Sequence, residues 1–403
     1  MRTEDLKKPV KKLLRADLII LFLLFVCFFY FFIYYTISDL QLHSNAVRMI
    51  NINRAAYPPN FLYYLILNIG SSFSKNFTVI LLATCIIMAV SMTAKYEVSR
   101  IVIKEKLISE GFINPKNFKL TIIFISFCLI LFFPIQDYIG AFEFRKYYYG
   151  KIVPNVWHNS TTIFLFPFAM LLFWKQYKEL KSGTPVSNSS LVTLSMLVVL
   201  NILIKPSFFI VFAPITILFL YIRYKISAEF TKNLIPIFIG LFLLYFMHRV
   251  TYILQLGSYN KSEGSITFSK PFEAWTYFAP GWYLPISFVH SYALPIFYMI
   301  FYWKESVRNN KLFQFTLSMT VLGLLISILV IENGPRKFHG NFMWQNVICT
   351  YILMLIVSCD LIKKYLEEGL KSIKLRTLII VFFLHAISGI IYIIKIFVTK
   401  SPA

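Results

Sequence analysis

The chain has 403 residues, of which 58% are hydrophobic and only 14% are charged. Soluble domains are typically about 45–50% apolar and about 25% charged, so this composition excludes an ordinary soluble globular protein. The net charge of +22 could indicate a nucleic-acid partner, but Lys and Arg cluster between alternate apolar runs. That distribution is typical of cytoplasmic loops in a membrane protein, so no nucleic-acid partner is expected.

Continuous apolar runs recur along the chain and predict an all-α, polytopic membrane bundle with about eleven transmembrane helices. The expected spans, in chain order, are 17–37, 76–94, 120–137, 160–175, 190–204, 207–223, 235–253, 284–303, 313–331, 343–361 and 377–397. The five cysteines all lie within apolar runs. They are interpreted as buried hydrophobic side chains rather than disulfide partners or metal ligands.

The basic segment 1–16 places the N-terminus in the cytoplasm, and an odd number of spans places the C-terminus outside. The first apolar run lacks a small-residue cleavage site, so it is expected to be a retained span. Residues 1–403 are expected to form a single transmembrane domain without a separate soluble unit. Its expected outer loops are 38–75, 138–159, 254–283 and 332–342.

The first outer loop begins with a polar stretch, 38–60, that carries an acidic residue where the first span ends. A carboxylate at that depth, here Asp39, is costly unless it is paired or functional. His43 follows four residues later and shares a helical face with Asp39 if the loop begins as a helix. No third ligand supports a zinc site, and a locally hydrogen-bonded interfacial histidine is the alternative. The apolar stretch 61–72 is too short to span and is expected to be an outer-face helix or half-helix running into the second span.

Asp137 is the second acidic residue at the outer end of a span. Two carboxylates at one cavity can divide the roles of base and orienting group, because neighbouring charges and desolvation separate their pKa values. The alternative is that each carboxylate only marks the end of its helix.

Basic residues on the outer side run against the positive-inside trend. Lys205 precedes Pro206, which breaks the helix between two short spans. Ammonium and guanidinium groups at this depth suit a phosphate or pyrophosphate at the headgroup level. The predicted donor phosphate-binding residues are Lys205, Arg336, Lys337, His339 and Arg54.

An aromatic loop precedes the fourth span, with Trp157, His158 and Asn159 after a proline. An aromatic platform beside an amide and an imidazole suits a sugar face and its hydroxyls. These three residues and Tyr57 are the predicted sugar- or acceptor-binding residues. The remaining Trp and Tyr residues are expected at the membrane interfaces whatever the function.

The early Asp and His, followed by YPPNFLYYLILNIGS, resemble the integral-membrane glycosyltransferases of the GT-C superfamily. The segments PNVWHNST and IKPSFF also resemble polytopic proteins of bacterial surface-polysaccharide loci, some of them polymerases. The resemblance covers a GT-C-like module, 1–224, and leaves 225–403 as additional transmembrane helices. It implies a bacterial inner (plasma) membrane protein with its active site facing the periplasm or the exterior.

The resemblance also implies an activity in cell-surface polysaccharide biosynthesis. A sugar would pass from a polyprenyl-phosphate-linked donor to a glycan or lipid-linked acceptor, with Asp39 as general base. Asp137 and His43 would position the acceptor or tune the base, and the basic residues would hold the donor phosphate. No cofactor is expected and metal dependence is left open. Membrane lipids and other envelope-polysaccharide assembly proteins are the further partners.

Two other functions are compatible with the sequence. A repeat-unit polymerase of O-antigen or capsule type would depend on Arg336 or Arg145 more than on Asp39. A lipid-linked glycan flippase or transporter would show internal repeats and cavity charges near the bilayer midplane. No repeat is evident, and the polar residues lie mainly at expected outer helix ends.

Overall fold

Helices form most of the computed structural model, which describes residues 16–112, 116–137, 151–154, 157–182, 185–250, 265–334 and 337–401. The α-helices are α1 (Ala16–Tyr35), α2 (Asp39–Asn51), α3 (Leu62–Gly70), α4 (Phe77–Ser109), α5 (Lys116–Leu131), α6 (Ser160–Ser182), α7 (Asn188–Ile204), α8 (Ser207–Tyr224), α9 (Ala228–His248), α10 (Glu273–Thr276), α11 (Leu284–Phe301), α12 (Lys311–Leu329), α13 (Trp344–Glu368) and α14 (Ile373–Thr399). Two strands, β1 (Ile266–Phe268) and β2 (Val330–Glu332), complete the regular structure together with short 3-10 and π turns.

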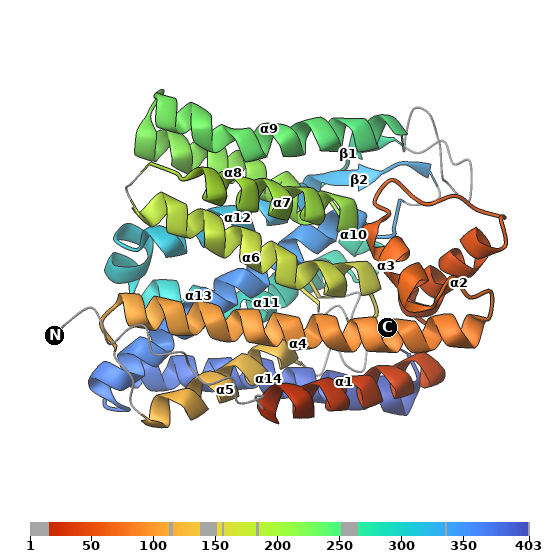
Figure 1. The fold of residues 1–403 in the computed structure, drawn as a ribbon. Helices are drawn as coiled ribbons and strands as arrows, with labels where there is room; N and C mark the ends of the chain where they lie inside the picture. The colour runs from red at the N-terminus through yellow and green to blue at the C-terminus, as the bar shows by residue number, and fades with distance from the viewer. Residues whose placement is uncertain are drawn as a thin grey trace.

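The long helices lie side by side in one bundle (Figure 1). The short helices α2 and α3 gather with β1 and β2 at one end, on the right of the view, which we call the α2 end. At the opposite end α6, α8 and α13 finish and α12 begins at Lys311, so we call it the Lys311 end.

The described chain is that of a membrane-embedded helical protein. Within the described residues, eight helices are long and apolar enough to cross a bilayer. Their outer faces carry large apolar side chains that are exposed in the isolated chain, such as Phe242 (74%) and Val398 (75%). A soluble protein seldom exposes so much contiguous apolar surface, whereas lipid covers it at no cost. The all-α polytopic fold expected from composition is therefore confirmed, while the count of eleven crossings and the orientation stay predictions.

Each expected span coincides with a helix, with some differences at the boundaries. The second span was expected to end at residue 94, but α4 continues to Ser109. The stretch 61–72 contains the expected outer helix, α3, but this helix does not run into the next one. Ser72 and Phe73 adopt positive φ angles of 51° and 54°, and this left-handed turn separates α3 from α4.

A two-stranded antiparallel ladder was not expected from the sequence. Ile266 pairs with Glu332 and Phe268 pairs with Val330. The ladder ties the segment before α10 to the end of α12. Glu332 is thereby held at the α2 end of the bundle.

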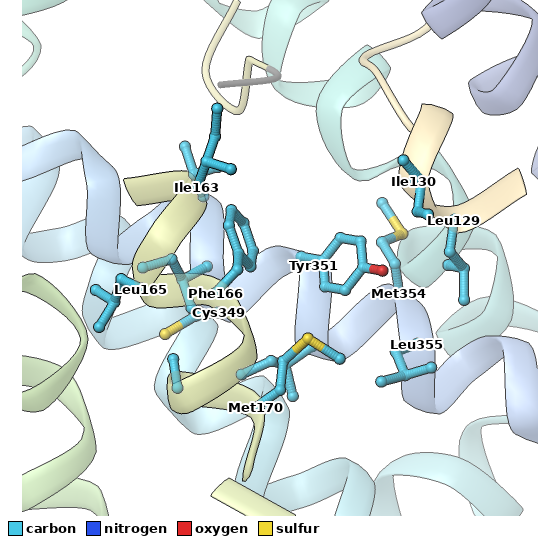
Figure 2. Packing of buried hydrophobic residues seen from close by; sticks show 14 of the residues in the cluster. Leu129, Ile130, Ile163, Leu165, Phe166, Met170, Cys349, Tyr351, Met354 and Leu355 are labelled. Carbon is cyan, nitrogen blue, oxygen red and sulfur yellow. The ribbon is translucent and has the colours of Figure 1, made fainter. Parts of the chain in front are cut away.

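The helix α13 forms the centre of the bundle, and its whole apolar stretch is buried inside the protein. Figure 2 shows Cys349, Tyr351 and Met354 of α13 packed between Phe166 of α6 and Ile130 of α5. Lys95 of α4 enters this core, with its ammonium 4.0 Å from the Phe166 ring centroid and 3.7 Å from that of Tyr351. Two aromatic faces thus surround a buried cation, an arrangement that the ring quadrupoles favour.

Candidate functional site

The helix α2 places Asp39 at its first position. Ser38 and Gln41 form a capping box, in which Gln41 Oε1 accepts a hydrogen bond from the Ser38 backbone amide at 2.9 Å. The Gln41 amide also donates to the Ile33 carbonyl at 2.6 Å, which fixes α2 against the end of α1. A carboxylate in the first helical turn is favoured by the helix dipole. Local sequence therefore determines where Asp39 lies.

Asn159 connects this carboxylate to a lysine from a distant helix junction. Its Nδ2 donates to Asp39 Oδ2 at 3.0 Å, and its Oδ1 accepts from Lys205 Nζ at 3.2 Å. The amide orientation follows from these partners, because a carboxylate only accepts and an ammonium only donates. Asn159 Oδ1 also accepts from the Thr162 backbone amide at 3.0 Å, so the same side chain caps α6.

Lys205 lies where α7 ends and α8 is about to begin, as expected from Pro206. Its ammonium donates to Thr162 Oγ1 at 2.9 Å and lies 4.9 Å from the centroid of the Trp344 ring. A cation at the C-terminus of α7 is also favoured by the helix dipole. The lysine is thus held by α6, α7 and α13 together.

Two histidines complete what we call the Asn159 cluster, defined as Asp39, His43, His158, Asn159, Ser160 and Lys205. His43 Nδ1 lies 2.6 Å from Ser160 Oγ, and the rings of Tyr63 and Tyr64 flank it edge-on. His158 stands edge-on to Trp344, with ring centroids 5.9 Å apart. The expected helical start of α2, which puts Asp39 and His43 on one face, is confirmed.

Burial keeps the two imidazoles of the cluster neutral near pH 7 and leaves its lysine partly charged. Burial lowers the pKa of His43 to about 4 and of His158 to about 4, although Asp39 acts in the opposite direction on both. Burial also lowers the pKa of Lys205 to about 7, against the raising effects of Asp39 and Glu332. A lysine poised near neutrality can gain or lose its proton as a ligand's charge changes.

Asp137 lies in a different group of side chains, which we call the Asp137 cluster. Asp137 Oδ2 accepts from Lys151 Nζ at 2.6 Å and from the Tyr283 hydroxyl at 2.8 Å, with His290 Nδ1 at 3.2 Å. Lys151 is only 1% exposed, and burial lowers its pKa while Asp137 counteracts this. The structure therefore pairs Asp137 with a buried lysine rather than with His43.

Trp157 and Tyr57 are held in protein packing. Trp157 is 2% exposed and contacts rings of α1, including Phe28 at a centroid distance of 4.9 Å. Its face is therefore unavailable as the expected sugar platform. The Tyr57 hydroxyl accepts a hydrogen bond from Asn68 at 2.6 Å, which ties the YPP segment to α3.

The other predicted phosphate-binding residues do not join Lys205. Lys337 forms an ion pair with Glu273 at 2.6 Å, and the hydrogen bond from Lys337 holds the pKa of that carboxyl below its usual range. Arg54 and His339 are exposed, without a side-chain hydrogen bond or ion pair to any residue the structure describes. Arg336 lies outside the described residues, as does Arg145.

Sequence reasoning did not single out several contact residues of both clusters. Ser160 and Thr162 follow Asn159 directly, and a run of hydroxyls at an expected helix start could have drawn attention to them. His290 lies within an apolar run and had no local signal. Lys151 and Tyr283 lie near expected outer loops, where a charge and an aromatic residue are common whatever the function. Their pairing through Asp137 depends on contacts between segments more than 100 residues apart.

No metal centre accompanies these clusters in the part of the chain that the structure describes, where no group of three His, Cys, Asp or Glu side chains is placed to hold an ion. The chemistry available is that of a carboxylate, an ammonium, imidazoles and hydroxyls. These groups can accept a proton from a hydroxyl and stabilise a phosphate anion.

Comparison with protein-family models, curated proteins and solved structures finds no match for this chain.

Proposed function

We propose that the protein is a membrane glycosyltransferase of GT-C type that acts at the α2 end of the bundle. It would transfer a sugar from a polyprenyl-phosphate-linked donor to a glycan or lipid-linked acceptor in cell-surface polysaccharide biosynthesis. The observation that supports this proposal is the Asp39–Asn159–Lys205 bridge, which places a potential base and a potential phosphate ligand on the two sides of one amide.

The proposed reaction assigns one role to each end of the bridge. Within the described residues only Asn159 donates to the Asp39 carboxylate, through Oδ2, so Oδ1 is available to an acceptor hydroxyl. Asp39 takes the hydroxyl proton as the acceptor oxygen bonds to the anomeric carbon of the sugar. The bond between that carbon and the phosphate oxygen breaks, and its electron pair leaves with the polyprenyl phosphate. Lys205 stabilises the charge that develops on this phosphate.

Asp39→Asn tests the proposal, because asparagine keeps the shape of the side chain but cannot act as a base. Surface glycan is measured in cells that lack the native copy, with the membrane level of each variant checked. A general base contributes about 10²–10⁴-fold in rate, so the glycan should be lost at normal protein level. Glu273→Gln is the matched control, since it removes a carboxylate that pairs with Lys337 outside the Asn159 cluster. Full glycan production by Asp39→Asn would contradict the assignment.

A second candidate function is a non-enzymatic lipid-glycan transporter. The charged contacts between long helices support it, above all Lys106 of α4 with Asp360 of α13 at 2.5 Å. Charged groups between transmembrane helices commonly mark a substrate or ion pathway. A transporter predicts that Asp39→Asn retains function while Asp360→Asn abolishes it, which is the opposite of the transferase prediction.

A further inference from the structure

A cavity of about 810 Å³ opens at the Lys311 end of the bundle, away from the Asn159 cluster. Its wall is formed by the C-terminal parts of α6, α8, α11 and α13, the C-terminal cap of α4, the π turn before α12 and the start of α12. This volume falls in the range of about 300–1,000 Å³ that is usual for small-molecule sites. The contacts in its wall indicate what it could hold.

The carboxylates of the cavity wall are compensated by lysines. Asp360 accepts from Lys106 at 2.5 Å and Glu110 accepts from the same ammonium at 2.7 Å. Lys364 pairs with Glu305, and Lys363 lies 3.6 Å from Glu110 and 4.0 Å from Glu367. Asp360 also accepts hydrogen bonds from the Tyr298 hydroxyl at 2.7 Å and from Asn310 at 3.1 Å. This side of the cavity therefore offers little unpaired negative charge.

Three cations in the cavity wall have no such compensation. Lys181 of α6, Arg223 of α8 and Lys311 of α12 form no ion pair with any residue the structure describes. Among the described residues, Lys181 donates to the Ser109 hydroxyl alone, at 3.2 Å. The cavity thus has excess positive charge from three different helices, and a guanidinium and two ammonium groups together favour a phosphate oxyanion.

Apolar side chains lie in the same wall. Phe219 and Ile222 of α8 line the cavity beside Arg223, and Tyr177 of α6 lines it beside Lys181. A ligand that combines a phosphate with an apolar or aromatic part would satisfy both kinds of side chain. Inorganic ions alone would leave the apolar part of the wall without a contact.

We propose that this cavity is a second ligand site, separate from the proposed transferase site, which binds a phosphate ester through Arg223, Lys311 and Lys181. The phosphate belongs either to an anionic lipid headgroup or to a soluble phosphate compound. The site does not depend on the proposed function, because it lies at the other end of the bundle and shares no residue with the Asn159 cluster.

The test uses the full chain with two probes. Native mass spectrometry measures retention of phosphatidylglycerol by the detergent-solubilised protein. Equilibrium dialysis in phosphatidylcholine nanodiscs measures binding of radiolabelled phenyl phosphate, a soluble ester that has both a phosphate and an aromatic part. The double variant Arg223→Gln/Lys311→Gln removes two exposed cations without breaking an ion pair between described residues. It should weaken binding of at least one probe by about tenfold or more, since hydrogen bonds to charged groups are individually strong.

Matched variants make the result specific. Lys371→Gln/Lys374→Gln removes two exposed charges near the start of α14, outside the cavity wall, and should change binding less than about twofold. The charge-preserving variant Arg223→Lys/Lys311→Arg should restore most of the binding. Loss confined to phosphatidylglycerol assigns the site to a lipid headgroup, and loss of phenyl phosphate binding assigns it to a soluble phosphate compound.

The proposal is overturned if the unmodified protein binds neither probe, or if both double glutamine variants bind alike. Asp39→Asn serves as an independent reference and should bind the probes at the cavity unchanged. A failure of this site is therefore distinguishable from a failure of the proposed transferase.

Discussion

Single side chains at the α2 end hold several polar groups of the hydrophobic bundle in place. The Asn159 side chain forms hydrogen bonds with Asp39, with Lys205 and with the first turn of α6. Lys205 in turn depends on burial, which brings its pKa to about 7. A group poised in this way makes its charge, and hence any bound anion, sensitive to pH in the neutral range.

Binding of a polyprenyl phosphate should weaken as pH rises through about 7, because Lys205 loses the charge that we propose holds the phosphate. From about pH 6 to about pH 8 the protonated fraction of a group with this pKa falls by about tenfold. Retention of undecaprenyl phosphate by the protein in phosphatidylcholine nanodiscs measures the effect. In Lys205→Arg the guanidinium stays charged throughout, so the pH dependence should be absent.

The same lysine affects stability in the opposite direction. Its pKa is lowered from 10.5 to about 7 in the folded protein, so the unfolded chain binds more protons between these values. Stability contributed by this group therefore rises with pH across that window. If thermal unfolding of the native protein and Lys205→Arg responded identically to pH there, Lys205 would not titrate as described.

At the α2 end of the bundle, a residue that caps a helix also belongs to the candidate site. The N-terminal cap of α6 is the residue that bridges Asp39 and Lys205, so helix stability and site geometry are joined at one position.

The contact between α5 and α14 is close because one of its residues, a glycine, has no side chain. A Cβ at Gly389 would lie 1.5 Å from the Leu131 carbonyl oxygen.

Replacement of Asn159 should separate the two roles of this residue. Asn159→Ser keeps a capping oxygen but is too short to bridge, whereas Asn159→Ala removes both contacts. The alanine variant should be less stable than the serine variant by about 1 kcal/mol, the usual value of a cap. Both should lose the surface glycan, measured with protein level and thermal unfolding in parallel. A serine variant with full activity would show that the bridge is dispensable.

Gly389→Ala should force α14 away from α5, because the nearest atom is backbone and cannot rotate aside. Overpacking of this kind typically costs about 1–3 kcal/mol. The expected result is a lower unfolding temperature in fluorescence-detected size-exclusion chromatography after heating. Gly281→Ala is the control, since no heavy atom lies within 4 Å of its added Cβ. Equal stability of the two variants would contradict the close approach.

Local features were predictable from sequence, and contacts between distant segments were not. The helices follow from apolar runs, and the shared face of Asp39 and His43 follows from a spacing of four in a helix that begins at Ser38. The bridge from Asn159 to Lys205 joins positions 46 residues apart, and no periodicity encodes it. Trp157 was expected to present its ring to a sugar, but it is buried against α1. Composition does not tell which side chains of a loop pack inward.

The bundle as a whole has two chemically different ends. The α2 end carries the Asn159 cluster, and the Lys311 end carries the cavity with its excess of cations. The predicted orientation places the Lys311 end in the cytoplasm, where basic loops are expected. The large cavity and the proposed transferase site would then face opposite sides of the membrane.

Cysteine labelling in intact cells tests this orientation. In a Cys27→Ser background the four remaining native cysteines are buried, so an introduced cysteine is the main target. Lys75→Cys, between α3 and α4 at the α2 end, should react with a membrane-impermeant maleimide in intact cells. Lys374→Cys at the Lys311 end should react only after permeabilisation. The reverse pattern would invert the predicted topology.

The burial of α13 on all sides leads us to expect that it enters the bilayer after most of its neighbours are in place. Its apolar stretch has no side left for lipid, and its carboxylate Asp360 would be costly in hydrocarbon without a counter-charge. The partner, Lys106 of α4, lies 254 residues earlier in the chain, so α4 is synthesised long before α13. We therefore expect the helices to insert in order, with the earlier helices assembled before α13 packs between them.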